Sequence, residues 1–292
     1  MTVRPRLLPL LLLGVASGAV AVPLLGPLVL GVLEYHVSAG ATDQLRGGDL
    51  ACLLLVAPVA AVAAWRVGRG LPGGTALALP PAAYGLYMWS QVAIGGDLGR
   101  YDGSSELFFP LFAVLVACCS GVLVLAGADV LRAEPPACSH RLRRACGWYF
   151  LATAAFLLLG LHLPGIVDSW REQPLSEEYA ADPVVFWVVK LMDMAYVVPL
   201  LATVGVALLR GRRTATILLA PVAGWCALLA TSVAGMALVM LASDAAGASL
   251  GLTVGMVVAA LAAVALAVRA FAPLLGSARD PVTTSPAAPA PV

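Results

Sequence analysis

Lys190 and Asp193 stand out chemically because both are charged and both lie inside an apolar stretch that runs from 184 to 209. Their spacing places them on one face of a helix, where an ammonium and a carboxylate can pair. A charge in the hydrocarbon core costs roughly 2.5–3.5 kcal/mol on insertion scales, so it marks a ligand, proton or ion site by default. The pair could equally neutralise itself and fasten this helix to its neighbours.

Further polar side chains fall inside or beside other apolar stretches, and on the same side of the expected membrane. One stripe along a helix is typical of hydrogen bonding between helices or of a cavity wall. If these stripes face one another, they line a pocket open to the outside. The pocket candidates are Asp193, Lys190, Tyr84, Tyr87, Gln91, His162, His36 and Glu34.

The elements that would position these residues follow from composition. The chain has 61% hydrophobic and 11% charged residues, against roughly 25% charged in soluble domains. A helix needs about 20 apolar residues to cross a bilayer. Eight stretches meet that need, the second being short: 8–33, 49–65, 75–95, 107–131, 146–168, 184–209, 214–241 and 246–270. The sequence predicts an all-α, polytopic transmembrane helix bundle in a single domain over 1–272, followed by a disordered Pro/Ala-rich tail over 273–292.

The arginines predict the orientation. They concentrate in alternate connections, such as Arg141–Arg144 and Arg210–Arg213, and beside both termini, whereas the other connections are rich in acids. Basic loops stay in the cytoplasm. We therefore expect both termini to be cytoplasmic. The abundance of Ala, Gly, Val and Arg is typical of a high-GC bacterial genome, and we therefore expect the protein in a bacterial inner membrane.

Several chemistries find no support. The six cysteines form no C-x-x-C motif, and we see no metalloprotease, phosphate-loop or nucleophile-elbow motif. Because these motifs are missing, no metal or cofactor is expected. Nucleic-acid binding is not expected either, because topology explains the arginine clusters.

Small residues suggest close helix packing. Gly14 and Gly18 share one helix face, and Gly247, Gly251 and Gly255 share another. The second set could pack within the chain or join two copies in a homo-oligomer.

Short echoes also occur, such as Val22-Pro23-Leu24 beside Val198-Pro199-Leu200. They are separated by five helices, and eight helices cannot hold two such units. We interpret them as chance.

The chain resembles a family of uncharacterised bacterial polytopic integral membrane proteins over roughly residues 45–240. The matching motifs are Gly48-Asp49-Leu50, Tyr84-x-x-Tyr87, Tyr101 ahead of Leu107-Phe108-Phe109, Asp182-Pro183 with Asp193 and Pro199, Arg210–Arg213, and Leu218-Leu219-Ala220-Pro221. The resemblance implies the same topology and draws attention to Asp193, but it implies no mechanism.

Three functions remain open. The first is binding or transport of a small solute at Asp193 and Lys190. The second is a membrane enzyme acting on a lipid-linked substrate, with Asp193, Glu34 or Asp49 as acid or base and His162 or His36 assisting. The third is a structural or accessory subunit whose only partners are the lipid bilayer and neighbouring proteins.

Overall fold

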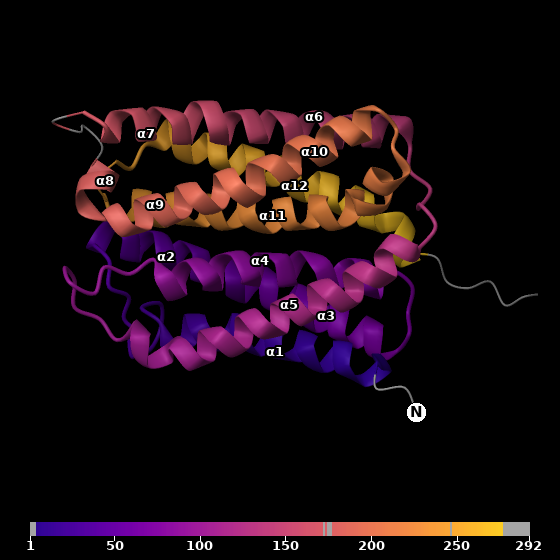
Figure 1. Ribbon diagram of the computed structural model, residues 1–292, viewed down its shortest axis with the longest axis horizontal. Coiled ribbons are helices and arrows are strands. Elements are labelled where there is room, and N and C mark those ends of the chain that lie inside the picture. Colours follow the sequence, from indigo (N-terminus) through magenta and orange to yellow (C-terminus); the bar gives the residue numbers. More distant parts are fainter. Residues whose placement is uncertain (1–3, 172, 174–176, 246, 277–292) are drawn as a thin grey trace, which may run out of the picture.

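The computed structural model describes residues 4–171, 173, 177–245 and 247–276, and these fold into antiparallel helices (Figure 1). The α-helices are α1 (Arg4–Leu25), α2 (Ala39–Ala51), α3 (Ala57–Gly68), α4 (Gly74–Ile94), α5 (Phe109–Arg132), α6 (His140–Ala155), α7 (Leu163–Ser169), α8 (Glu177–Ala181), α9 (Pro183–Met192), α10 (Val198–Leu209), α11 (Arg213–Ala242) and α12 (Leu250–Gly276). Three π-helical turns, Cys52–Val56, Phe156–His162 and Asp193–Val197, join α2 to α3, α6 to α7 and α9 to α10, and the 3-10 turn Ser105–Phe108 precedes α5.

The helices confirm a multi-pass membrane protein. Within the described residues, seven helical segments are long and apolar enough to cross a bilayer: Arg6–Leu25, Ala39–Gly68, Ser105–Arg132, His140–Ser169, Pro183–Leu209, Arg213–Ala242 and Leu250–Gly276. The stretch predicted at 75–95 forms α4, which runs beside these segments in the middle of the bundle.

Two helix boundaries differ from the prediction. The first helix ends at Leu25 rather than at 33, because Pro27 disfavours helical geometry at Gly26. The second helix begins at Ala39 rather than at 49, because the Ser38 side chain accepts a hydrogen bond from the Ala41 amide and caps the helix. Asp43 and Arg46 fall in the predicted connection between 33 and 49, but they lie within α2, where their side chains pair at 2.9 Å.

Each π-helical turn ends two residues before a proline, at Pro58, Pro164 or Pro199. A proline has no N–H and its ring clashes with the carbonyl four residues earlier. The preceding amide therefore reaches one residue further back, as when Val198 donates to the Asp193 carbonyl. Such turns recur at functional sites, and Asp193 opens one of them.

The second half of the chain repeats the first. One constant shift along the sequence carries Cys52–Val56 onto Asp193–Val197, and Ala57–Gly68 onto Val198–Leu209. The same shift carries Pro23, Pro58 and Pro80 onto Pro164, Pro199 and Pro221, and Arg69-Gly70 onto Arg210-Gly211. Gly70 and Gly211 both adopt positive φ, at 62° and 68°. The shift spans four helices, so the two units have the same orientation and differ from the five-helix echo that we set aside.

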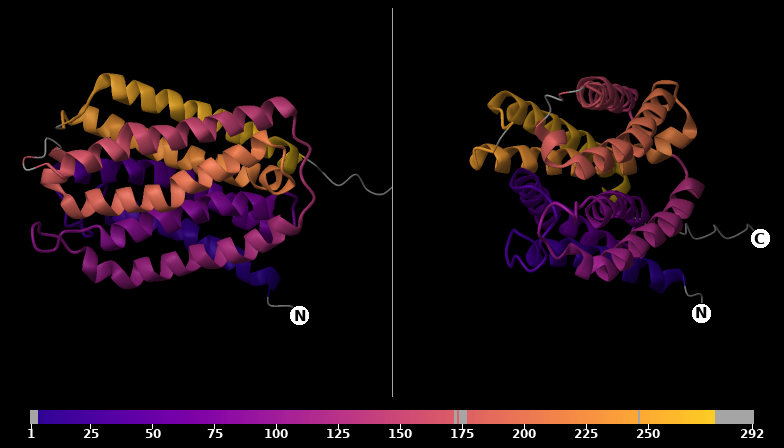
Figure 2. Two further views of the ribbon diagram at one scale, coloured as in Figure 1. Left: turned by 45° about the horizontal axis from the view of Figure 1, so that its top comes forward. Right: turned by 60° about the vertical axis from the view of Figure 1, so that its left-hand side comes forward.

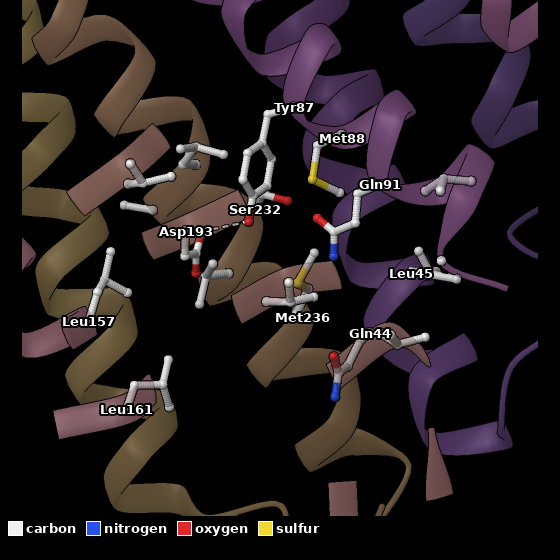
Figure 3. Close-up of a pocket in the computed structure, with 18 of the residues that line it drawn as sticks. Gln44, Leu45, Tyr87, Met88, Gln91, Leu157, Leu161, Asp193, Ser232 and Met236 are labelled. Atoms are coloured by element: carbon white, nitrogen blue, oxygen red, sulfur yellow. Dashed lines mark hydrogen bonds between the residues drawn. The ribbon is translucent and has the colours of Figure 1, made fainter. Parts of the chain in front are cut away.

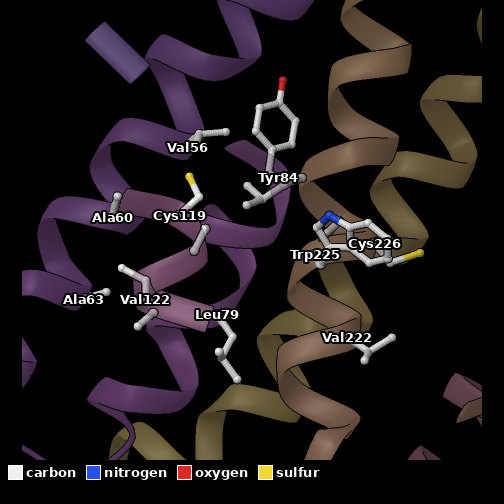
Figure 4. Close-up of a cluster of buried hydrophobic side chains, with 14 of the residues drawn as sticks. Val56, Ala60, Ala63, Leu79, Tyr84, Cys119, Val122, Val222, Trp225 and Cys226 are labelled. Carbon is white, nitrogen blue, oxygen red and sulfur yellow. The ribbon is translucent and has the colours of Figure 1, made fainter. Parts of the chain in front are cut away.

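The two halves form two layers, with α1–α5 in one and α6–α12 in the other (Figures 1 and 2). Their shared core lies between α4 and α11. Figure 4 shows Leu79 and Tyr84 of α4 beside Val222 and Trp225 of α11. The Tyr84 hydroxyl donates a hydrogen bond to the Ser232 hydroxyl across this interface at 3.0 Å, so a hydrogen bond also joins the two layers.

The two predicted glycine stripes have different positions in the structure. Gly14 and Gly18 of α1 lie against Cys118 and Leu115 of α5, which confirms packing within the chain. Gly247 precedes α12 and has a φ of 79°, so the three glycines do not share one helix face. Gly251 and Gly255 face outward on α12, and association of two copies through these glycines stays a prediction. Helix α12 continues to Gly276, so the first four residues of the predicted tail are helical, and 277–292 lie outside the described residues.

Candidate functional site

A cavity of about 510 Å³ lies between the two halves of the bundle. It reaches from the loops at one end of the helices to their middle, and its wall is mainly apolar. Figure 3 shows the lining side chains converging from α2, α4 and α11, and from the segments around the π-helical turns Phe156–His162 and Asp193–Val197. Among the described residues of this wall are Gln44, Leu45, Tyr87, Met88, Gln91, Leu157, Leu161, Val189, Asp193, Ser232 and Met236. The volume falls within the range of small-molecule sites.

Asp193 is held by two side chains from other helices. The Tyr87 hydroxyl donates to Oδ1 at 2.6 Å, and Nε2 of His162 lies 2.8 Å from Oδ2. Only 8% of Asp193 and 1% of His162 is exposed. One carboxylate therefore joins α4 of the first repeat to two helices of the second, and both its oxygens are fixed in place.

The hydrogen bonds of this cluster fit one tautomer of His162. Nδ1 of His162 is buried and has no partner among the described residues, so a proton on both ring nitrogens would leave one N–H unsatisfied. The neutral tautomer with its proton on Nε2 fits the geometry and donates to Asp193. In that tautomer Asp193 accepts from two donors, Tyr87 and His162.

The predicted Lys190–Asp193 pair is not formed. No ion pair joins these two described residues, because Asp193 turns toward His162 and Tyr87. The Lys190 ammonium instead lies 3.4 Å from the ring centroid of Phe186, a cation–π contact. Lys190 is 4% exposed and does not line the cavity. The position of Lys190 and Asp193 on one helix face was therefore not enough to identify the partner of Asp193.

The other predicted site residues separate into two groups. Tyr87 and Gln91 line the cavity, His36 lines its end, and His162 supports Asp193 from behind. Tyr84 is buried on Ser232 and Glu34 is exposed, and neither belongs to the cavity wall.

A cap of loops covers one end of the cavity. His36 lies at its centre: Nε2 is 2.6 Å from Glu106 and Nδ1 is 2.7 Å from the carbonyl of Tyr101. The Tyr101 hydroxyl donates to the Ala181 carbonyl at 2.8 Å, and the Ser38 amide donates to Asp182 at 2.8 Å. Three segments far apart in the sequence are thereby tied together at the end opposite the start of α1 (Figure 1).

The cap should loosen as pH rises. Both partners of the His36 ring are acceptors, and the hydrogen bond to Glu106, followed by that to Tyr101, raises the pKa of His36 above its ordinary 6.5. A raised folded-state pKa gives stability that is complete below 6.5 and is lost as pH passes the folded value. We expect amide hydrogen exchange of residues 97–104, corrected for intrinsic rates, to become faster once the pH exceeds the pKa of His36 in the folded protein.

His36→Gln should abolish this pH dependence, whereas His140→Gln, a histidine at the start of α6, should preserve it. An unchanged profile in His36→Gln would show that the His36 ring does not control the cap.

We attribute the cavity to a difference between the two repeats. In the first repeat Gly47 of α2 lies against the backbone of Gly235 and Met236 in α11. The repeat shift places Val188-Val189 at the positions of Gly47-Gly48. The glycines let α2 close on α11, whereas Val189 of α9 lines an open space.

Several lining residues carried no sequence signal. Gln44, Ser232 and Met236 are ordinary polar or apolar residues in helices and are recognisable only once α2 and α11 are placed. The Ser38–Asp182 contact joins residues 144 positions apart, and neither residue is unusual by itself.

Compared with family models, with curated proteins and with solved structures, the chain matches none of them. Its function has to be inferred from this geometry.

Proposed function

We propose that this multi-pass protein binds a small amphipathic cation in the central cavity, as a receptor or carrier in a bacterial cytoplasmic membrane. The observation that carries the proposal is a single fixed carboxylate in a mainly apolar wall. Among the described lining residues Asp193 is the only carboxylate, and none is a lysine or arginine. A ligand that fits is therefore largely apolar and bears one positive or hydrogen-bond-donating group.

Aromatic and sulfur-containing side chains suit the apolar part of such a ligand. Tyr87 and Tyr149 line the cavity, and tyrosine rings attract cations. Met88, Met236 and Met256 add polarisable, adaptable surface. Tyr87 has two roles, since its hydroxyl also fixes Asp193. A rigid anchor and a deformable wall together favour a class of ligands that shares a charge but varies in shape.

We also propose that α4 is an eighth crossing and that the cap faces outward. The 21 residues of α4 extend about 31 Å at 1.5 Å per residue, close to a hydrocarbon core of about 30 Å. The start of α1 and the end of α12 lie at one end of the bundle, which requires an even number of crossings (Figure 1). The arginine excess places that end in the cytoplasm. The capped end of the cavity then lies on the outer side of the membrane, the side on which the sequence predicts the pocket.

Binding of a fluorescent lipophilic cation tests the proposal. We expect rhodamine 6G to bind the protein in nanodiscs, by fluorescence anisotropy, and Asp193→Asn to weaken its affinity at least about tenfold, or about 1.4 kcal/mol. Removing the charge leaves a side chain of the same size. Tyr196→Phe is the matched control, because Tyr196 belongs to the same π-helical turn but is 61% exposed on the outside of the bundle.

Empty nanodiscs and the neutral dye Nile red separate the alternatives. If Nile red binds as tightly and Asp193→Asn leaves rhodamine 6G binding unchanged, the cavity takes neutral lipids and the cation class is wrong. If neither dye binds the folded protein, the polar cluster serves only to join helices, as expected of an accessory subunit.

A further inference from the structure

A second buried acid, Asp49 of α2, lies apart from the cavity and has no charge partner within the part of the chain that the structure describes. Its residue exposure is 8%, and Oδ2 is fully buried without a hydrogen-bond partner among the described residues. An isolated carboxylate in an apolar interior is costly unless a cation or proton compensates it. Arg46, one helical turn earlier, bonds Asp43 and the Pro27 carbonyl instead.

Oxygen atoms converge beside Asp49 at the end of α1. The point at which Gly26 would carry a Cβ lies 3.0 Å from the Val22 carbonyl oxygen, 3.3 Å from Asp49 Oδ2 and 3.5 Å from the Tyr35 hydroxyl. The Gly26 amide is already used, since it donates to the Val22 carbonyl at 2.8 Å. The absence of a side chain at Gly26 therefore lets oxygen atoms from three segments approach the same part of the backbone.

The local field beside Gly26 favours a positive charge. Val22 lies in the last turn of α1, which ends at Leu25, and the carbonyls at a helix C-terminus carry negative partial charge. A carboxylate placed there adds to that charge instead of balancing it.

The second repeat supplies a positive group at the matching position. The repeat shift places Lys190 at the position of Asp49. The Lys190 side chain is buried against Gly165 of α7, as Asp49 is buried against Gly26 after α1. One repeat has an ammonium where the other has an anion.

We propose that Asp49 Oδ2, the Tyr35 hydroxyl and the Val22 carbonyl bind one Na⁺ ion. Hard cations take oxygen ligands, and divalent ions generally require several carboxylates or many more oxygens than these. A single carboxylate with two neutral oxygens matches a monovalent ion, with water completing its coordination. Tyr35 also lines the central cavity, so the ion lies one side chain away from it. The site depends on no assumption about the ligand of that cavity.

Thermal unfolding of the full chain in nanodiscs tests this site. At constant ionic strength we compare NaCl, KCl and N-methyl-D-glucamine chloride. A ligand that binds only the folded state raises Tm in a saturable manner. We expect Na⁺ to raise the Tm of the wild type by several degrees relative to N-methyl-D-glucamine.

Asp49→Asn and Gly26→Ala should both lose the Na⁺ increment, the first by removing the charge and the second by placing a methyl group against the three oxygens. Asp43→Asn and Gly127→Ala are matched controls and should keep it, because Asp43 is paired on the same helix and Gly127 borders open space. If Asp49→Asn fails to fold, Gly26→Ala and Tyr35→Phe still decide the question.

Three results would overturn the proposal. The wild-type Tm could be equal in all three salts, or the Na⁺ increment could persist in Asp49→Asn. A Tm that depends on pH and is the same in Na⁺ and N-methyl-D-glucamine would show that Asp49 carries a proton instead. Each of these results leaves dye binding at Asp193 unaffected, so failure here is distinguishable from failure of the proposed function.

Discussion

Gly47→Ala should lower the free energy of unfolding by at least about 3 kcal/mol, an unusually large effect for one added methyl group. A Cβ on Gly47 would lie 2.4 Å from both the Cα and the N of Met236, and 2.5 Å from the carbonyl carbon of Gly235. These are backbone atoms of α11, which cannot rotate away as a side chain can. Overpacking ordinarily costs 1–3 kcal/mol, and more where the neighbours cannot yield. Either α2 must move away from α11 or the fold is lost.

Denaturation in mixed detergent micelles, followed with a thiol-reactive dye, measures this effect because Cys52, Cys119, Cys146 and Cys226 are buried in the fold. Gly255→Ala is the control. It makes the same change in α12 with nothing within 4 Å, and alanine favours a helix over glycine by roughly 0.5–1 kcal/mol. Equal stability of Gly47→Ala and wild type would contradict the close α2–α11 contact and the explanation of the cavity that rests on it.

The helical membrane class could be predicted from the sequence because hydropathy and length decide it directly. The two misplaced helix boundaries have a shared physical cause. Val29, Leu30 and Val32 are apolar but not helical, and they are more than half exposed. Hydropathy reports that a segment tolerates a membrane and does not report where the helix ends. Pro27 and Ser38 are the local signals that set the boundaries, and they were present in the sequence.

The repeat could also have been found in the sequence. Three prolines recur at one spacing, and Arg69-Gly70 recurs as Arg210-Gly211 at the same spacing. The resemblance is weak elsewhere, because apolar residues in a membrane exchange freely as long as helix packing is kept. Prolines and turn glycines exchange less freely, since each fixes a backbone geometry. Comparing helices four apart, instead of five, reveals the duplication.

The candidate site was predicted in composition but not in connectivity. Tyr87, Gln91, His162 and Asp193 do meet at or beside one cavity. The partner of Asp193 was assigned wrongly because helical periodicity describes neighbours on one helix alone. The contacts with Tyr87 and His162 span 106 and 31 residues, and they depend on how the two repeats are placed against each other.

His162→Leu should be among the most destabilising substitutions at the site, at about 3–5 kcal/mol. It leaves the Asp193 carboxylate buried with one donor instead of two, and leaving a buried carboxylate short of a donor costs more than the hydrogen bond itself contributes. Asp193→Asn should cost less, because the amide oxygen still accepts from Tyr87 and no charge remains. When the carboxylate is neutralised first, the loss of His162 should matter much less. The two substitutions should therefore show a coupling energy of at least about 2 kcal/mol in a double-mutant cycle.

A second cycle distinguishes this arrangement from the pairing suggested by helix periodicity. Combining Asp193→Asn with Lys190→Met should give effects that add to within about 0.5 kcal/mol, since Lys190 contacts Phe186 and not Asp193. Both cycles can be measured by unfolding in mixed detergent micelles at one pH. Strong coupling of Asp193 to Lys190 and none to His162 would restore the pairing along one helix. It would also contradict the hydrogen bond from a neutral His162 ring to Asp193. The proposal that Asp193 offers an uncompensated negative charge to the ligand of the cavity would then fail.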